Sequence, residues 1–197
     1  MPELKALHDP KVLRAIAHPV RNRILDELSA HGSLRAADIA RELDIPANQA
    51  SFHLRQLAKY GLVEEDPAAA RDKRDRVWRV AHEGGLSINF DDIASQPGGA
   101  AAADVFRHNA TAWAQYLVRR AYEDERDERV HRSISDTALL LTKNEARELT
   151  DELHEVLDRW ARRTRADDST ERRTYLHFSM LQPHPGRGEH DAPANES

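Results

Sequence analysis

Residues 36–63, AADIARELDIPANQASFHLRQLAKYGLV, predict two short helices separated by a tight turn. The turn is Asp44-Ile45-Pro46, and the second helix, of about residues 47–60, ends at Gly61, a residue suited to the left-handed conformation just past a helix. Two short helices joined by such a turn form a helix-turn-helix arrangement. The first helix, residues 36–43, places these apolar residues at helical spacing: Ile39, Ala40 and Leu43.

The residues that follow predict a β-hairpin. Residues 62–65 and 76–82 have the composition of strands, and the polar loop between them, residues 66–75, carries basic side chains. A hairpin with a basic tip directly after a helix-turn-helix is expected to be its wing.

Two further helices are expected before residue 36. Asp9-Pro10 is an N-cap followed by a first-turn proline, so a helix begins there. A second helix begins at His18-Pro19 and ends at His31-Gly32, and a short extended piece follows at residues 33–35.

Three blocks in residues 10–82 match the pattern of a known group. The blocks are His18-Pro19-x-Arg21 with Ile24, Leu25 and Leu28; Asp38-Ile39-Ala40-x-x-Leu43; and Ser51-x-His53-Leu54-x-x-Leu57-x-x-x-Gly61-Leu62-Val63. This combination resembles the ArsR-type winged-helix repressors. The resemblance implies a homodimer that sits on an operator and responds to an effector.

The chain departs from the metal sensors of that group. Such sensors use cysteines in the recognition segment or Asp and His residues on a C-terminal helix, whereas this chain has no cysteine. Asp104 and His108 lie one helical turn apart, but no second pair with ligand spacing follows them. No metal site and no cofactor are therefore expected.

The helix of about residues 47–59 is expected to read DNA. Its buried side is Ala50, Leu54 and Leu57, and the opposite side carries amide, guanidinium and hydroxyl groups that can bond base edges in the major groove. Phe52 either packs against a thymine methyl or extends the core, and His53 either holds the helix, the favoured role, or reads a base. The candidate DNA-binding residues, wing included, are Asn48, Gln49, Ser51, Phe52, His53, Arg55, Gln56, Lys59, Arg71, Lys73, Arg74 and Arg76.

The chain after residue 82 predicts a linker and a second domain. Glycines and prolines mark residues 83–100 as a linker with one short strand at about 86–90. An amphipathic helix of about 101–128 is expected next, with candidate dimerisation residues on it and on the first helix: Leu13, Ile16, Phe106, Trp113 and Leu117.

The rest of the second domain is expected to add one helix and extended segments. Residues 134–141 look extended, and Thr142-Lys143-Asn144-Glu145 is a capping box that opens a helix ending near Trp160. The alternation in residues 175–181 predicts a strand, and residues 182–197 are expected to be disordered. The domains are thus 1–82, 83–100, 101–181 and 182–197. The fold class is α+β, mainly α: an N-terminal winged helix-turn-helix domain with a helix-rich α+β domain that dimerises or senses.

Charge and composition narrow the class of function. The net charge is −5, but residues 1–82 hold 14 Lys or Arg against 12 Asp or Glu, whereas residues 83–197 hold 15 against 22. The basic excess lies in the half assigned to DNA. With no long apolar run and no catalytic motif, we expect a cytoplasmic protein that is neither membrane-bound nor an enzyme.

The sequence therefore predicts a homodimeric repressor that binds double-stranded DNA at an inverted repeat. The alternative is a regulator whose C-terminal domain senses a metal or a small-molecule effector.

Overall fold

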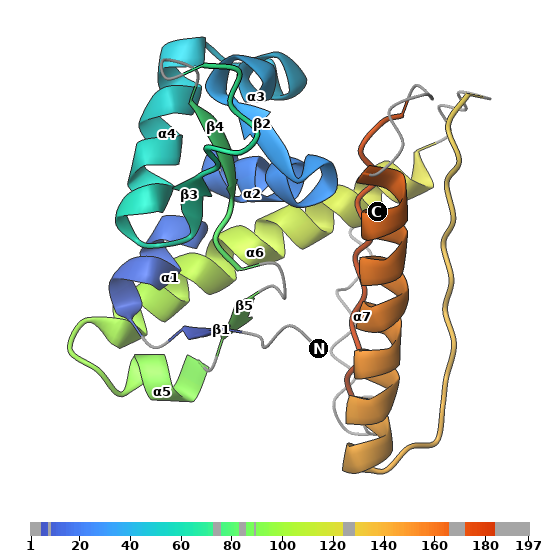
Figure 1. The fold of residues 1–197 in the computed structure, drawn as a ribbon. Coiled ribbons are helices and arrows are strands. Elements are labelled where there is room, and N and C mark those ends of the chain that lie inside the picture. Colours follow the sequence, from blue (N-terminus) through green and yellow to red (C-terminus); the bar gives the residue numbers. More distant parts are fainter. Residues whose placement is uncertain are drawn as a thin grey trace.

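The computed structural model describes residues 5–7, 9–72, 76–82, 86–88, 90–123, 129–165 and 172–183. Figure 1 shows a winged domain, a long helix that runs beneath it, and a separate helix with extended chain beside it. The elements in chain order are β1 (Lys5–Leu7), α1 (Pro10–Ile16), α2 (Pro19–His31), β2 (Ser33–Arg35), α3 (Ala36–Leu43), α4 (Ala47–Lys59), β3 (Val63–Glu65), β4 (Val77–Val80), β5 (Leu86–Ile88), α5 (Phe90–Ala94), α6 (Gly99–Tyr122) and α7 (Lys143–Arg165).

The expected winged helix-turn-helix is confirmed. The strands β2, β4 and β3 form an antiparallel sheet in that order, and β3 and β4 make the hairpin. In the register, Val63 lies opposite Val80, and Leu34 lies opposite Trp78. The expected extended piece before α3 is thus the third strand of the sheet. The chain is mainly helical α+β, as expected.

The helix ends follow the local signals in the sequence. Asp9 caps α1 by accepting a 2.8 Å hydrogen bond from the Lys11 backbone N–H. After α4, Gly61 has φ +67°, and its N–H donates to the Ala58 carbonyl while the Leu62 N–H donates to that of Leu57. These two bonds make a Schellman motif, which turns the chain sharply from α4 into the wing.

The core joins α1–α5, the sheet and the first half of α6. Its seven largest side chains with almost no exposure are apolar. The buried alanines Ala102 and Ala103 let α6 pack closely against α1. The seven residues are Leu13, Ile24, Leu28, Ile39, Leu54, Leu57 and Ile93.

The segment predicted as a linker contains regular structure. The expected short strand is β5, and it pairs in parallel with β1, which was not expected. The unexpected helix α5 packs on the start of α6, and a Cβ on Gly99 would lie only 1.7 Å from the Ile93 carbonyl oxygen. Glycine at this position therefore permits the close contact of α5 with α6. The helix expected from 101 begins at Gly99 and is described to Tyr122, and residues 124–128 lie outside the described part.

The C-terminal arm, which we define as residues 129–165 and 172–183, holds one helix. The capping box is confirmed, because Thr142 N–H donates to Glu145 Oε2 at 2.7 Å and Glu145 N–H donates to Thr142 Oγ1 at 3.3 Å. The strand expected at 175–181 is wrong: these residues have no regular structure, because no strand of the described chain lies beside them to complete a ladder. The expected disorder of the tail falls mostly on residues 184–197, outside the described part.

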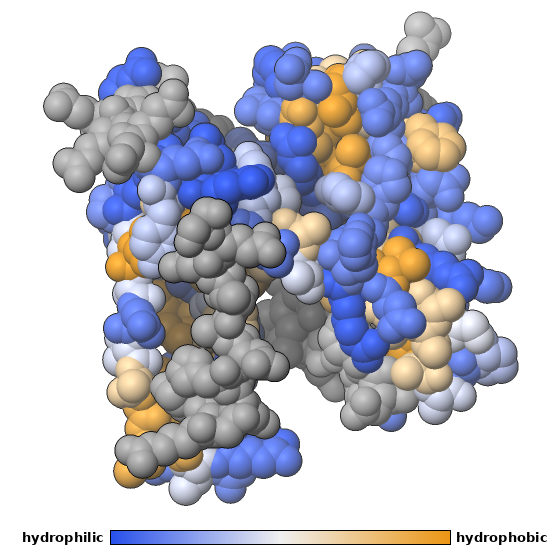
Figure 2. Space-filling model, turned by 180° about the vertical axis from the view of Figure 1, so that it is seen from behind, coloured by the Kyte–Doolittle hydropathy of each residue, from blue (hydrophilic) through white to orange (hydrophobic). Residues whose placement is uncertain are grey.

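No residue of the arm is buried in the described chain. Figure 2 shows apolar side chains at the surface of this body, which is on the left in that view. The exposed large apolar side chains on α7 and after it include Leu153 (45%), Trp160 (53%), Phe178 (50%) and Met180 (64%). Among the described helices, none has the length and apolar character needed to cross a membrane.

Candidate nucleic-acid interface

The helix α4 packs one side into the domain as predicted. Ala50, Leu54 and Leu57 are fully buried, where they meet α2 and α3. Their spacing of three and four residues places them on one helix face, so burying them fixes the rotation of α4 about its axis.

The opposite side of α4 is open to solvent. Seven of the eight candidate residues on this helix lie there or at its borders: Asn48, Gln49, Phe52, Arg55 and Lys59 are exposed, and Ser51 and Gln56 are half-buried. The exposed amides and guanidinium are groups that can bond adenine and guanine edges. An exposed face of this chemistry on the second helix of the motif is competent for major-groove contact.

Two residues of this face already have local contacts. The Asn48 side-chain oxygen accepts a 2.9 Å hydrogen bond from the Gln49 backbone N–H, so a bidentate contact of Asn48 with adenine would have to displace that bond. Phe52 is 51% exposed and meets the ring of His53 edge-on, with the two ring centres 5.4 Å apart. Both expected roles of Phe52 are compatible with this position.

His53 is the candidate that does not reach the open face. It is 6% exposed, and its ring lies 4.7 Å from that of His18, the N-cap residue of α2. The pKa of His18 is lowered mainly by burial and to a smaller extent by the nearby Arg21. The pKa of His53 is also lowered mainly by burial, with smaller effects from His18 and Arg21. Both shifts favour the neutral imidazole, and the favoured role for His53, holding α4 in place, fits its buried position.

The same cluster contains two buried polar atoms without hydrogen-bond partners in the described chain, His18 Nδ1 and Arg21 Nε. In the sequence, His18 and Arg21 mark only the first ArsR-like block. Their spacing on α2 could have suggested a shared face, but their contact with α4 depends on tertiary packing.

The base of the wing is fastened by a contact that the sequence did not indicate. The Ser33 hydroxyl, on β2, donates a 2.7 Å hydrogen bond to Asp66 Oδ2, at the end of β3. Asp66 also accepts from the Ala68 backbone N–H at 3.2 Å, and these bonds, the Ser33 one first, lower the pKa of Asp66. The ionised carboxylate therefore holds the start of the wing loop against the sheet.

The wing presents its basic side chains beside carboxylates. Arg71 and Arg76 are exposed, and the Arg76 guanidinium lies 3.6 Å from Glu65. Arg79, which was not a candidate, pairs with Glu64 at 2.6 Å. Phosphate contact by Arg76 would compete with its exposed ion pair, which is weak enough to exchange. Lys73 and Arg74 lie outside the described residues.

The candidate dimerisation residues divide into two groups. Leu13 and Ile16 are buried within the single chain against α6 and belong to its core. Phe106, Trp113 and Leu117 are half-buried on α6, where the Trp113 ring stacks on Tyr116 with centres 5.4 Å apart. Beyond Trp113 the exposed side of α6 continues with Val118 and Tyr122. Leu13 and Ile16 are thus already covered by this chain, whereas Phe106, Trp113 and Leu117 remain partly open.

The described residues contain no group of three or more His, Asp or Glu side chains arranged to hold a metal ion. Asp104 is instead engaged with Arg107, whose guanidinium lies 3.1 Å from its carboxylate.

Residues 16–66 match the model of a family described as a helix-turn-helix domain. No curated protein matches the sequence. One similar solved structure is the homodimeric winged helix-turn-helix DNA-binding domain of a possible ArsR-family transcriptional regulator from Mycobacterium bovis, with 26% identity, 59% of this chain and 83% of that chain covered, and a TM-score of 0.33. Another is a MarR variant from E. coli, with 16% identity, 74% of this chain and 85% of that chain covered, and a TM-score of 0.33.

A third similar structure is a MepR variant from S. aureus bound to an oligodeoxyribonucleotide, with 17% identity, 76% of this chain and 87% of that chain covered, and a TM-score of 0.31. The family match spans α2 through β3 and agrees with the ArsR-type resemblance of the motifs. In sequence and in structure, residues 16–66 therefore form a helix-turn-helix domain, to which the β3–β4 hairpin adds a wing.

Proposed function

We propose that this protein is a sequence-specific DNA-binding transcriptional regulator that acts as a homodimer on an inverted-repeat operator. In this proposal α4 enters the major groove and the wing contacts phosphates. The observation that carries it is the division of α4 into a fully buried apolar side and an open side with Asn48, Gln49 and Arg55.

The homodimer is supported by the arm. Its apolar side chains on α7 stay partly exposed in the described chain: Leu153 by 45%, Leu157 by 39% and Trp160 by 53%. Apolar patches of this kind are typical of surfaces that another chain covers. A second copy is the partner that a palindromic operator requires, because each copy would read one half-site.

The test of sequence-specific binding is selection from random DNA duplexes with the full chain. We expect an enriched inverted repeat whose half-sites are about one helical turn apart, roughly 10 base pairs, or a multiple of that. Gln49→Ala or Asn48→Ala should change the preferred bases, whereas Arg74→Ala should weaken binding to all sequences alike and lower the salt dependence by about one ion. Exposed Arg162 on α7 supplies the control, because Arg162→Ala removes the same charge far from α4. Enrichment of no motif would refute the proposal.

The dimer is tested by sedimentation of the full chain. Leu157→Glu should yield a monomer, because it places a charge on the exposed apolar side of α7, while the helical content of the winged domain stays intact. His154→Glu introduces the same charge at an exposed polar position of α7 and should leave the dimer in place. A monomeric wild-type chain at micromolar concentration would contradict the homodimer.

A further inference from the structure

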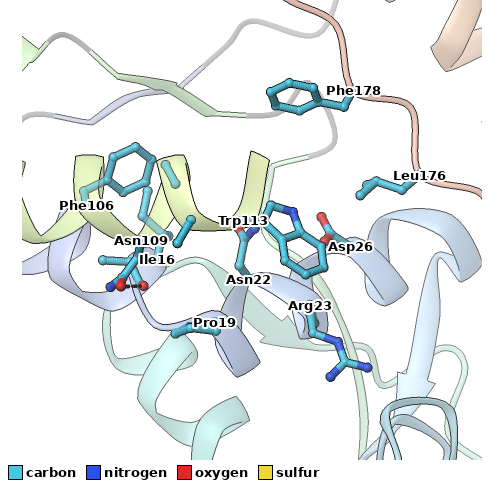
Figure 3. A pocket seen from close by; sticks show the side chains of 13 residues that line it. Ile16, Pro19, Asn22, Arg23, Asp26, Phe106, Asn109, Trp113, Leu176 and Phe178 are labelled. Atoms are coloured by element: carbon cyan, nitrogen blue, oxygen red, sulfur yellow. Dashed lines mark hydrogen bonds between the residues drawn. The ribbon is translucent and has the colours of Figure 1, made fainter. Parts of the chain in front are cut away.

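A cavity of about 470 Å³ lies where the winged domain, α6 and the arm meet. Figure 3 shows its walls: the start of α2 on one side, the middle of α6 on another, and the arm residues Leu176 and Phe178 across from them. The volume is within the range of sites for drug-sized molecules, and most of the wall is apolar or aromatic.

One carboxylate stands in this apolar wall. Asp26, on α2, is half-buried, and burial, with Glu27 adding to it, raises its pKa to about 6. In the described chain no hydrogen bond or ion pair reaches its side chain. Arg23 also lines the cavity and opposes the shift, and Figure 3 shows its guanidinium directed away from Leu176 and Phe178. Asp26 and Trp113 line the same cavity. A carboxylate without a partner in an apolar cavity is costly unless a cation or a donor joins it.

The aromatic walls select the rest of the ligand. Trp113 and Phe106 come from α6 and Phe178 from the arm, so aromatic side chains face a ligand from two sides of the cavity. A positive group beside Asp26 would meet the Trp113 ring as well, and a cation over an indole is attracted by the ring electrons. We propose that this cavity binds an aromatic organic cation, with its ring among Phe106, Trp113 and Phe178 and its ammonium or amidinium group at Asp26.

The cavity's position links such a ligand to DNA binding, a step that rests on the proposed function. The arm contacts α2 next to Asp26: the Thr174 hydroxyl lies 2.8 Å from the Glu27 carboxylate, and the Arg165 guanidinium donates to the Ser29 carbonyl. The helix α2 in turn packs against α4. A molecule seated between α2, α6 and the arm therefore contacts both the arm and the helix that supports the reading helix.

Isothermal titration calorimetry of the full chain tests the site without DNA. The probes are 2-naphthylmethylamine, its neutral analogue 2-naphthylmethanol and the anion 2-naphthoate, which share one ring system and differ in charge. We expect the amine to bind at least about tenfold more tightly than the alcohol, and the anion to bind least. In Asp26→Asn the preference for the amine over the alcohol should vanish while the alcohol binds as before.

The controls separate a charge effect from a folding effect. Asp151→Asn removes the same charge from an exposed position on α7 and should keep the full preference for the amine. Trp113→Ala should weaken the amine and the alcohol, and the amine more, because the ring also attracts the cation, with unchanged helical content by circular dichroism. No binding of the amine, as expected if a second copy of the chain fills the cavity, would overturn the proposal, and so would equal binding of the amine by wild type and Asp26→Asn.

The amine is then added to the operator complex. A changed operator affinity supports the link between the cavity and α4, and an unchanged one overturns that link while the calorimetry still decides the site. If no operator is found, the proposed function fails, and the calorimetric result stands apart from it.

Discussion

Leu54 and Arg55 are neighbours in the sequence but lie on opposite sides of α4, and this opposition can be tested directly. Leu54 is fully buried, so Leu54→Ala removes three packed side-chain carbons and leaves a cavity. Such substitutions cost about 2–5 kcal/mol of unfolding free energy. Arg55 is exposed on the open side and has no hydrogen bond or ion pair in the described chain, so Arg55→Ala should change stability by at most about 0.5 kcal/mol.

The two substitutions should have the opposite order of effect on the base preference in DNA binding, with Arg55→Ala changing it and Leu54→Ala leaving it unchanged. If Arg55 bonds a guanine, Arg55→Ala removes about 1–3 kcal/mol of discrimination at that base pair. This corresponds to a loss of about 5- to 150-fold in preference for guanine at one operator position. Leu54→Ala should keep the same preferred bases, because it touches none of them.

The assay pairs urea unfolding of each variant with competition binding against operators changed at one base pair. If Arg55→Ala unfolds as easily as Leu54→Ala, α4 does not have the orientation described. If Arg55→Ala binds with unchanged base preference at every position, Arg55 does not contact a base.

Three further outcomes are expected. Gly61→Ala should cost about 1–2 kcal/mol in urea unfolding, because its φ of +67° is left-handed although open space surrounds the new Cβ, and Gly61→Asn should cost less; equal stability of all three would contradict the Schellman turn. Burial lowers the pKa of His53 below 6.5, so the unfolded chain binds more protons than the folded one as pH falls below 6.5, and the free energy of unfolding drops there. Urea unfolding at pH 5 and 7.5 should show a smaller drop in His53→Gln than in wild type, and an equal drop would exclude His53 as its source. Thr142→Ala should raise the lowered pKa of Glu145 only part of the way toward 4.5 in an NMR titration, because the Thr142 backbone N–H, the larger cause, remains, and it should reduce the helicity of α7; Ser133→Ala, outside the capping box, should do neither.

The helix-turn-helix could be predicted because its signals are local. The cap at Asp9, the break at Pro19 and the glycine at Gly61 each act within one turn of the chain, and the spacing of Leu54 and Leu57 sets which side of α4 is buried. The contacts that complete the interface are not local. Ser33 meets Asp66 across 33 residues, and His18 meets His53 only because α2 and α4 pack together.

The arm could not be predicted for a different reason. The alternation in residues 175–181 indicates only that one side of the segment is apolar. Such a segment forms a strand only where another strand supplies hydrogen bonds. The described chain supplies none there, and the apolar side of α7 is likewise left open. The pattern in the sequence thus specifies a surface to be covered, without specifying which chain covers it.

The helix α2 is where these features meet. It buries Ile24 and Leu28 in the core, packs on α4, carries Asp26 in the cavity wall and accepts the arm through Ser29 and Glu27. A helix packed this tightly moves as a body, because core side chains resist small continuous shifts. A ligand at Asp26 can change DNA binding only if the arm or α6 has two placements relative to α2 and the ligand binds one of them more tightly. The size of the change is set by the difference between the two affinities. The arm, held to α2 by exposed polar contacts and no buried side chain, is the part whose placement such a difference can change.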